Sequence, residues 1–273
     1  MVEAKEKPLA GKVAVVSGAT RHAGRGVAIE LGIAGATVYC TGRSVRGRPS
    51  PRNGKETIEE TAEMVEAHGG KAIWVQVDHR DIDQVESLFD RVWREQGRLD
   101  LLVNSIAGSA GNNPFLQSHL ADELQAIDNG ARCHIIAANV AARRMVEAKS
   151  GLIISISDHE WDQFYAMERA VINRLATNVA DELRPNGVAI LSLLPGGFFR
   201  CFGIMTEEEH LAAVQRDPDV LKCHTPRLIG RGVVALATDP NIMQKSGKVI
   251  DLHDLVPEYG FTDIDGRQTG EMW

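Results

Sequence analysis

The chain alternates short apolar runs with stretches of helical periodicity from near its beginning to near its end. Runs that are apolar along their whole length must be covered on both faces, so the alternation predicts an α/β fold built on a parallel sheet. Right-handed crossovers then make the sheet doubly wound, with about seven strands. The predicted strands are 12–18, 36–42, 71–78, 99–105, 151–157, 187–197 and 246–252. The predicted helices are 24–36, 55–70, 82–97, about 121–148, 163–184 and about 226–238.

No internal repeat, low-complexity tract or proline-rich linker interrupts the 273 residues, so we expect a single domain over 1–273. Residues 198–226 break the alternation. We expect them to be an insertion over the carboxyl edge of the sheet, where they would act as a substrate lid. Phe198, Phe199 and Phe202 supply apolar side chains there, either for a lid or for ordinary core contacts.

Charge and composition argue against several kinds of partner. A net charge of -7 and a pI of about 5.7 disfavour nucleic acids and acidic membranes. No apolar run reaches the roughly 18 residues of a membrane span, and residues 1–12 lack the apolar core of a secretory signal. The four cysteines form no C-x-x-C pair, which indicates reduced thiols in a cytoplasmic protein.

Glycines follow the first predicted strand, in the stretch SGATRHAGRG. Gly18, Gly24 and Gly26 would let the backbone approach a pyrophosphate at the amino end of the next helix. A strict G-x-x-x-G-x-G pattern would have glycine in place of His22. The position of this turn, after a strand and before a helix, predicts a dinucleotide site.

Arginines follow the second predicted strand, at the place where an NAD site has an acidic residue. The stretch TGRSVRGRPSPR carries Arg43, Arg46, Arg48 and Arg52 and no acid. Guanidinium groups bind a 2′-phosphate that a carboxylate would repel. We therefore expect NADP(H) to be favoured over NAD(H), with Arg21 and Arg43 as the main contacts. The alternative is a solvated basic loop.

Together these motifs resemble the short-chain dehydrogenase/reductase family over roughly residues 8–267. The stretch LAGKVAVVSGATRHAGRG resembles the family's cofactor turn, and DLLVNSIAG resembles its Asn-Asn-Ala-Gly strand end, with Ser105 in place of the second Asn. VQVDHRD places Asp78 where the family contacts adenine, and LLPGG resembles the Pro-Gly turn after the sixth strand. The stretch TPRLIGRGVVALATDPNIMQKSGKVIDLHDLVPEYGFTDIDGR is similar to the tail of the dehydrogenase/reductase member 1-like subgroup.

The resemblance implies a Rossmann fold and hydride transfer between NAD(P) and a small carbonyl or alcohol substrate. It also implies a homodimer or homotetramer that pairs the helices near 121–148 and 163–184. With the arginines above, the expected cofactor contacts are Gly18, Thr20, Arg21, Gly24, Arg43, Asp78, Asn104, Ala107, Tyr165, Arg169, Pro195 and Gly196. The catalytic residues that it implies are Tyr165, Arg169, Ser157 and Asn129.

The stretch FYAMERAVINRLA places Tyr165 and Arg169 four residues apart, on one face of a helix. The family has Lys at the second position. Arg169 would keep the positive charge that lowers the pKa of a phenol, but it cannot give up a proton of its own. The i, i+4 series of apolar residues in this helix predicts the opposite, core-facing stripe. That series is Met167, Val171, Leu175, Val179 and Leu183.

The family's serine is missing here. Its usual spacing before the tyrosine points to a position inside the strand 151–157 that carries no serine. Aligning the strand instead puts Ser157 beside the serine position and Asp158 on it. An ionised Asp158 cannot donate to a carbonyl and could pair with Arg169. Ser157 or His159 could be the donor, and Ser157 is preferred.

Two functional classes remain open at this point. Tyr165 favours a working reductase or dehydrogenase, while the missing Ser and Lys favour an NADP-binding sensor or scaffold without turnover. The acidic residues of 158–162 suit a solvated loop whose negative field disfavours anionic substrates. We expect no metal site there.

Overall fold

The computed structural model describes residues 7–48, 54–108, 114–158, 163–196, 201 and 203–268. Some residues singled out above lie outside these ranges, namely Arg52, His159, Phe198, Phe199 and Phe202.

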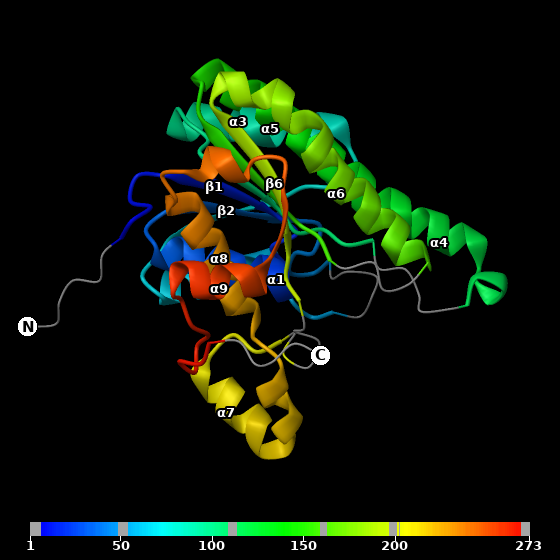
Figure 1. The fold of residues 1–273 in the computed structure, drawn as a ribbon, viewed down its shortest axis with the longest axis vertical. Helices are drawn as coiled ribbons and strands as arrows, with labels where there is room; N and C mark the ends of the chain where they lie inside the picture. Colours follow the sequence, from blue (N-terminus) through cyan, green and yellow to red (C-terminus); the bar gives the residue numbers. More distant parts are fainter. Residues whose placement is uncertain are drawn as a thin grey trace, which may run out of the picture.

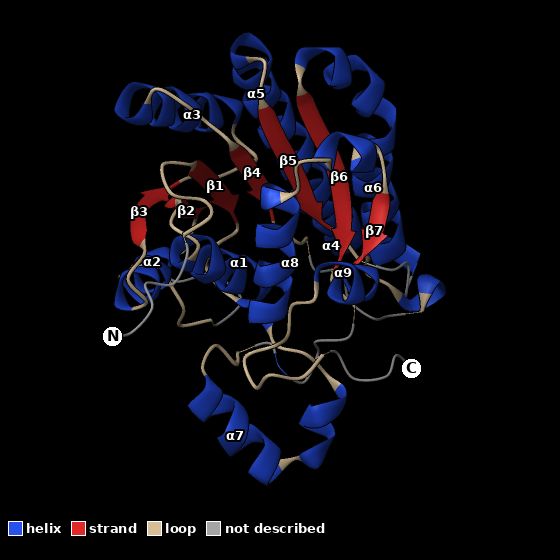
Figure 2. Cartoon of the chain, turned by 60° about the vertical axis from the view of Figure 1, so that its left-hand side comes forward, coloured by secondary structure: helices blue, strands red, loops and turns tan. Residues whose placement is uncertain are grey.

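Seven parallel strands form one sheet in the order β3-β2-β1-β4-β5-β6-β7. This confirms the predicted doubly wound fold (Figure 2). Every strand lies within or close to its predicted range. The strands are β1 (Val13–Ser17), β2 (Thr37–Gly42), β3 (Lys71–Gln76), β4 (Leu101–Asn104), β5 (Gly151–Ile156), β6 (Val188–Leu194) and β7 (Val249–Asp251).

Helices cover both faces of the sheet, as Figure 1 shows. On one side lie α1 (His22–Ile33), α2 (Ile58–Ala67), α8 (Pro226–Thr238) and α9 (Leu252–Tyr259). On the other lie α3 (Ile82–Gln96), α5 (Cys133–Ala148) and α6 (Gln163–Leu183).

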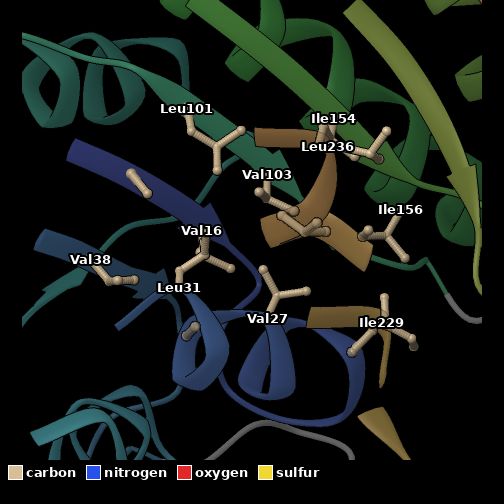
Figure 3. Packing of buried hydrophobic residues seen from close by; sticks show 14 of the residues in the cluster. Val16, Val27, Leu31, Val38, Leu101, Val103, Ile154, Ile156, Ile229 and Leu236 are labelled. Atoms are coloured by element: carbon tan, nitrogen blue, oxygen red, sulfur yellow. The ribbon is translucent and has the colours of Figure 1, made fainter. Parts of the chain in front are cut away.

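Alternate side chains of each strand supply the two cores, as the period of a strand requires. In β1, Ala14 and Val16 pack under α1 and α8, whereas Val13 and Val15 face α3 and α5. Figure 3 shows Val16 beside Val27 of α1 and the side chain of Ile229 on α8 nearby. Burial of each such side chain contributes about 1.5–3 kcal/mol, so continuous apolar strands are stable only with both faces covered.

The helix predicted over about 121–148 is interrupted. It consists of α4 (Leu120–Ile127), the π-helical turn η2 (Asp128–Arg132) and α5. A π-helical turn adds one residue to the helical repeat and often marks a functional site. Helix α9, which starts directly after β7, was not predicted.

The apolar stripe predicted for α6 is confirmed at Leu175, Val179 and Leu183, which pack in or against the core, and is wrong at Met167 and Val171. Met167 is 49% exposed and Val171 40% exposed, while Ile172, Ala176 and Ala180 are buried. The buried face is therefore rotated from the predicted one, and it carries Glu168 and Arg169 as well. Periodicity identified apolar residues four apart, but it did not identify the neighbouring stripe of Ile172, Ala176 and Ala180, which is the more deeply buried one.

Residues 203–225 carry α7 (Glu207–Arg216) and the 3₁₀ turn η5 (Pro218–Lys222). They lie on the side toward which the strands point with their carboxyl ends (Figure 2). This segment has a small apolar cluster of its own, formed by Cys201, Ile204, Ala213, Val220 and Cys223. Its role as a substrate lid stays a prediction. Of the described helices, none combines the length and the apolar character that a bilayer crossing needs.

Candidate active site

The strand order reverses between β1 and β4, and ligands of such sheets bind at the carboxyl ends of the strands at that point. Ser17 at the end of β1 donates from Oγ to Oδ1 of Asn104 at the end of β4, at 2.7 Å. Nδ2 of Asn104 donates to the carbonyl of His134 in α5, at 3.5 Å. The Asn104 side chain thus joins three elements under the site.

The glycine turn after β1 leaves no room for side chains. Gly18 has a φ of +78°, and a Cβ there would lie 2.8 Å from the carbonyl oxygen of Ser105. A Cβ on Gly24 would lie 2.2 Å from the carbonyl oxygen of Gly18. The backbone is therefore drawn tightly against the start of α1, as a pyrophosphate-binding turn requires.

His22 explains how the turn departs from the family pattern. It has a φ of +48°, in the left-handed region that favours glycine. The conformation that glycine would adopt is thus kept, although the residue is a histidine. Burial, followed by the nearby charge of Arg21, lowers the pKa of His22 below its usual value.

The predicted phosphate-binding arginines differ in how far they are engaged. Arg46 is paired with Glu63 at 2.6 Å, and Arg21 has Nη1 4.0 Å from Oε2 of Glu56. Arg43 is exposed at the end of β2 and makes no ion pair within the part of the chain that the structure describes. Among the described residues, Arg43 therefore has no ion pair that an incoming anion would have to displace.

Asp78, at the predicted adenine position, is held by Arg80. Nη2 of Arg80 lies 2.6 Å from Oδ2 of Asp78, and Nε lies 3.0 Å from Oδ1. The hydrogen bond to Arg80 lowers the pKa of Asp78 to about 2, so the carboxyl stays ionised. Nη1 of Arg80 also donates to Oδ1 of Asn129, at 3.1 Å, and Gln125 donates to the same oxygen. The structure thus joins Asn129 to the Asp78 side of the site, and its catalytic role stays a prediction.

The catalytic tyrosine candidate contacts an acid. Oη of Tyr165 donates to Oδ2 of Asp158 at 3.0 Å, and Asp158 itself is buried. Burial raises the pKa of Tyr165 above its usual value. The charge of Arg169 opposes this rise, and Asp158 adds to it through its charge and its hydrogen bond. The charge of Arg169 thus acts in the expected direction, but burial and Asp158 outweigh it.

Arg169 lies under the tyrosine ring, with Cζ 4.7 Å from the ring centroid. Its guanidinium is buried, donates to Oε1 of Glu168 and reaches the carbonyl of Ile156 at 3.5 Å. The suggested pair with Asp158 is replaced by the pair with Glu168. Sequence reasoning missed Glu168, because adjacent residues of a helix do not usually face each other.

Ser157, the preferred replacement for the family's serine, is buried. Its N–H donates to the carbonyl of Leu193 at 2.9 Å, and its Oγ has no hydrogen-bond partner among the described residues. Between Ser157 and Asp158, only Asp158 is seen in contact with Tyr165. The assignment of Ser157 stays a prediction.

Two histidines that were not predicted as site residues contact the Pro195–Gly196 turn, which is the other turn predicted to bind the cofactor. Nε2 of His224 donates to the carbonyl of Pro195 at 2.6 Å. Gly196 has a φ of +70°, and a Cβ there would lie 2.3 Å from Cε1 of His253. Nδ1 of His253 lies 2.8 Å from Oδ1 of Asp251. The backbone of the Pro195–Gly196 turn is therefore fixed from beneath, and no local motif around either histidine gave a signal.

The other predicted cofactor contacts lie around the same strand ends. Thr20 is buried in the glycine turn, where its carbonyl accepts from Nε of Arg25 at 3.1 Å. Ala107 is exposed after β4. The preceding Ile106 is held at its carbonyl by Nε2 of His134, at 3.0 Å. The structure thus gathers the predicted residues at one edge of the sheet, and their roles stay predictions.

Comparisons with known proteins agree with this geometry. A family model described as short chain dehydrogenase matches residues 12–200. The chain is 39% identical over 280 residues to dehydrogenase/reductase SDR family member 1 of Mus musculus, covering 95% of this chain and 85% of the relative. The Homo sapiens protein of the same name is 39% identical over 286 residues, with the same coverage.

Solved structures share the fold. A hydroxysteroid dehydrogenase from Escherichia coli has a TM-score of 0.72 at 22% identity, covering 89% of this chain and 95% of that one. A metagenomic short-chain oxidoreductase solved in complex with NADP has a TM-score of 0.66 at 25% identity, covering 89% of this chain and 98% of that one.

Proposed function

The chain belongs to the short-chain dehydrogenase/reductase family, and from that premise we propose an NADP(H)-dependent oxidoreductase with Tyr165 as its general acid/base. When bound, the nicotinamide supplies or accepts the hydride. The substrate is a small carbonyl or alcohol compound. The observation that carries the proposal is the hydrogen bond from Tyr165 to Asp158, at the edge of the sheet where the glycine turn lies.

The chain offers a fitting cradle for a dinucleotide. The positions of Gly18 and Gly24 admit no Cβ, so backbone can reach a diphosphate there. Arg43 has no competing ion pair in the described residues, which supports a contact with a 2′-phosphate and hence NADP(H) over NAD(H). Arg21 is the second contact that we propose, and the NADP complex of a structural relative is consistent with this choice.

Proton transfer at Tyr165 follows from the polarity of its hydrogen bond. When an alcohol is oxidised, its hydroxyl proton passes to Oη of Tyr165 while the phenol proton passes to Asp158. Because the pKa of Tyr165 is raised, a free tyrosinate is costly, and the two transfers occur together. In the direction of carbonyl reduction, Tyr165 gives its proton to the substrate oxygen and regains one from Asp158.

A screen of ketones, aldehydes and alcohols followed by nicotinamide absorbance tests the proposal. We expect turnover of at least one class with NADPH or NADP⁺, and its loss in Tyr165→Phe. If cofactor binds but no compound is turned over, the alternative of an NADP-binding sensor or scaffold is supported instead.

We also propose a homodimer or homotetramer. Met167 and Val171 of α6 and Ile135 of α5 are apolar and exposed, which suits helix pairing between subunits. Sedimentation of the purified protein measures the state directly, and a monomer at micromolar concentration would contradict the proposal.

A further inference from the structure

The Tyr165 site contains a buried charge pair that joins two consecutive residues. Successive residues on a helix point about 100° apart, so they rarely pair with each other. Glu168 and Arg169 do so here, with side chains that are 0% and 2% exposed. Arg169 donates from Nη2 to Oε1 of Glu168. Buried charges are screened little by solvent, so each one is felt strongly by its neighbours.

Two glycines make room for the carboxylate of Glu168. The N–H of Gly108, in the loop after β4, donates to Oε1 at 3.0 Å. A Cβ on Gly130, in the π-helical turn η2, would lie 1.8 Å from the same oxygen. A Cβ on Gly108 would lie 2.7 Å from Oε2. Glu168 therefore connects α6 to the loop after β4 and to η2, and any side chain at Gly130 would displace it.

Several charges bear on the phenol of Tyr165 from the surrounding elements. Arg169 acts to lower its pKa, whereas Asp158 and Glu168 act to raise it. His134 of α5 lies near Arg169, and burial lowers its pKa to about 3, so it stays neutral. The buried carboxyl on α4, which packs against α6, is that of Glu123. The positive charge of Arg169 under the Tyr165 ring is thus paired with the negative charge of Glu168, its neighbour in the sequence.

We propose that Glu168 is a positioning residue that fixes Arg169 beneath Tyr165 and offsets part of its charge there. The phenol then keeps its proton until Asp158 can accept it. The inference rests on the proposed function of Tyr165 for its meaning in turnover. The charge offset itself is a property of the protein without cofactor or substrate.

Tyrosinate absorbance in the ultraviolet tests the inference directly, because the chain has only three tyrosines. The alkaline titration of Glu168→Gln is compared with that of Glu168→Gln/Tyr165→Phe, and the difference isolates Tyr165. Glu182→Gln is the matched control, since Glu182 is exposed on the same helix. Circular dichroism at each pH checks that the protein is still folded.

We expect the Tyr165 transition of Glu168→Gln to fall by about 1 pH unit or more, since an uncompensated cation remains beside the ring. The control variant should titrate like the parent protein. If Tyr165 titrates in Glu168→Gln at the same pH as in the parent, the inference is overturned. Because no turnover is measured, this failure is separate from a failure of the proposed catalytic role.

Glu168→Gln could unfold, because it leaves Arg169 buried without its partner. The double variant Glu168→Gln/Arg169→Gln removes both charges and keeps hydrogen-bonding groups of similar length. A folded double variant whose Tyr165 transition lies at or above that of the parent supports the charge offset. A double variant with a transition lowered by about 1 pH unit contradicts it.

Discussion

The phenol of Tyr165 donates a hydrogen bond to the carboxylate of Asp158, 3.0 Å away, across the junction between β5 and α6. A carboxylate accepts hydrogen bonds, whereas the serine of related enzymes can donate one. The oxygen of an incoming substrate therefore meets a phenol whose proton already points at an acceptor. We therefore expect Asp158 to be the partner of Tyr165 in proton exchange.

Replacing Tyr165 with Phe removes the proposed acid/base and little else. We expect turnover to fall by about 100-fold or more, because general acid–base catalysis contributes on that order. The dissociation constant for NADPH, measured by fluorescence titration, should change by less than about 3-fold. Tyr259→Phe on α9 is the matched control, since it removes a phenol that donates to Asp239 at the end of α8. Full turnover in Tyr165→Phe would move the chemistry to another residue.

Replacing Asp158 with Asn keeps the shape of the side chain but removes its ability to take a proton. Steady-state rates of alcohol oxidation should fall by about 10- to 100-fold. Ser157→Ala, measured in parallel, decides whether Ser157 or Asp158 is the residue that acts together with Tyr165. If Ser157→Ala loses more activity than Asp158→Asn, the serine assignment is right and the role proposed for Asp158 is wrong.

Replacing Arg43 with Ala should weaken binding of NADPH by about 10- to 100-fold, the usual worth of a charge-assisted hydrogen bond to phosphate. Binding of NADH should change little, because NADH lacks the 2′-phosphate. Arg46→Ala serves as the control, since Arg46 is already paired with Glu63. Titrations of both cofactors measure the ratio, and equal losses for NADPH and NADH would refute a 2′-phosphate contact.

Two buried histidines make stability depend on pH below neutrality. Burial lowers the pKa of His79 to about 4 and that of His134 to about 3. The unfolded chain binds protons near pH 6.5 while the folded chain does not, so the free energy of unfolding falls as the pH falls. The loss reaches about 2 kcal/mol per histidine at pH 5.

Urea unfolding at pH 7 and pH 5 measures this loss. His134→Gln cannot gain a proton in the unfolded state, so it should lose about 2 kcal/mol less than the parent between the two pH values. His119→Gln is the control, because His119 is exposed. An identical loss in His134→Gln and the parent protein would show that His134 does not contribute.

The packing of α1 against α8 depends on Gly26. A Cβ there would lie 2.2 Å from the backbone oxygen of Pro226, so α8 would have to move. Gly26→Ala should lower the free energy of unfolding by about 2–3 kcal/mol, as overpacking does. Gly203→Ala is the control, since a Cβ at Gly203 meets nothing within 4 Å. Denaturant unfolding compares the two, and equal stabilities would refute this account of the contact.

The sequence alone determined the sheet, most of its covering helices and the glycine turn between β1 and α1. Strands that are apolar throughout can be buried only between two layers, and glycines after a strand leave few alternatives for the backbone. The cysteine and charge patterns added little to this. Even the departure at His22 left the turn intact, because the left-handed conformation was kept with a different residue.

Tertiary structure decided which side chains meet at the site. The buried face of α6 could not be predicted from the sizes of its apolar residues. Ile172, Ala176 and Ala180 are buried, whereas Met167 is exposed. The pairing of Glu168 with Arg169 depends on space that Gly108 and Gly130 leave from two other segments. Such space is a property of packed neighbours far apart in the chain, which local periodicity and motif spacing do not encode.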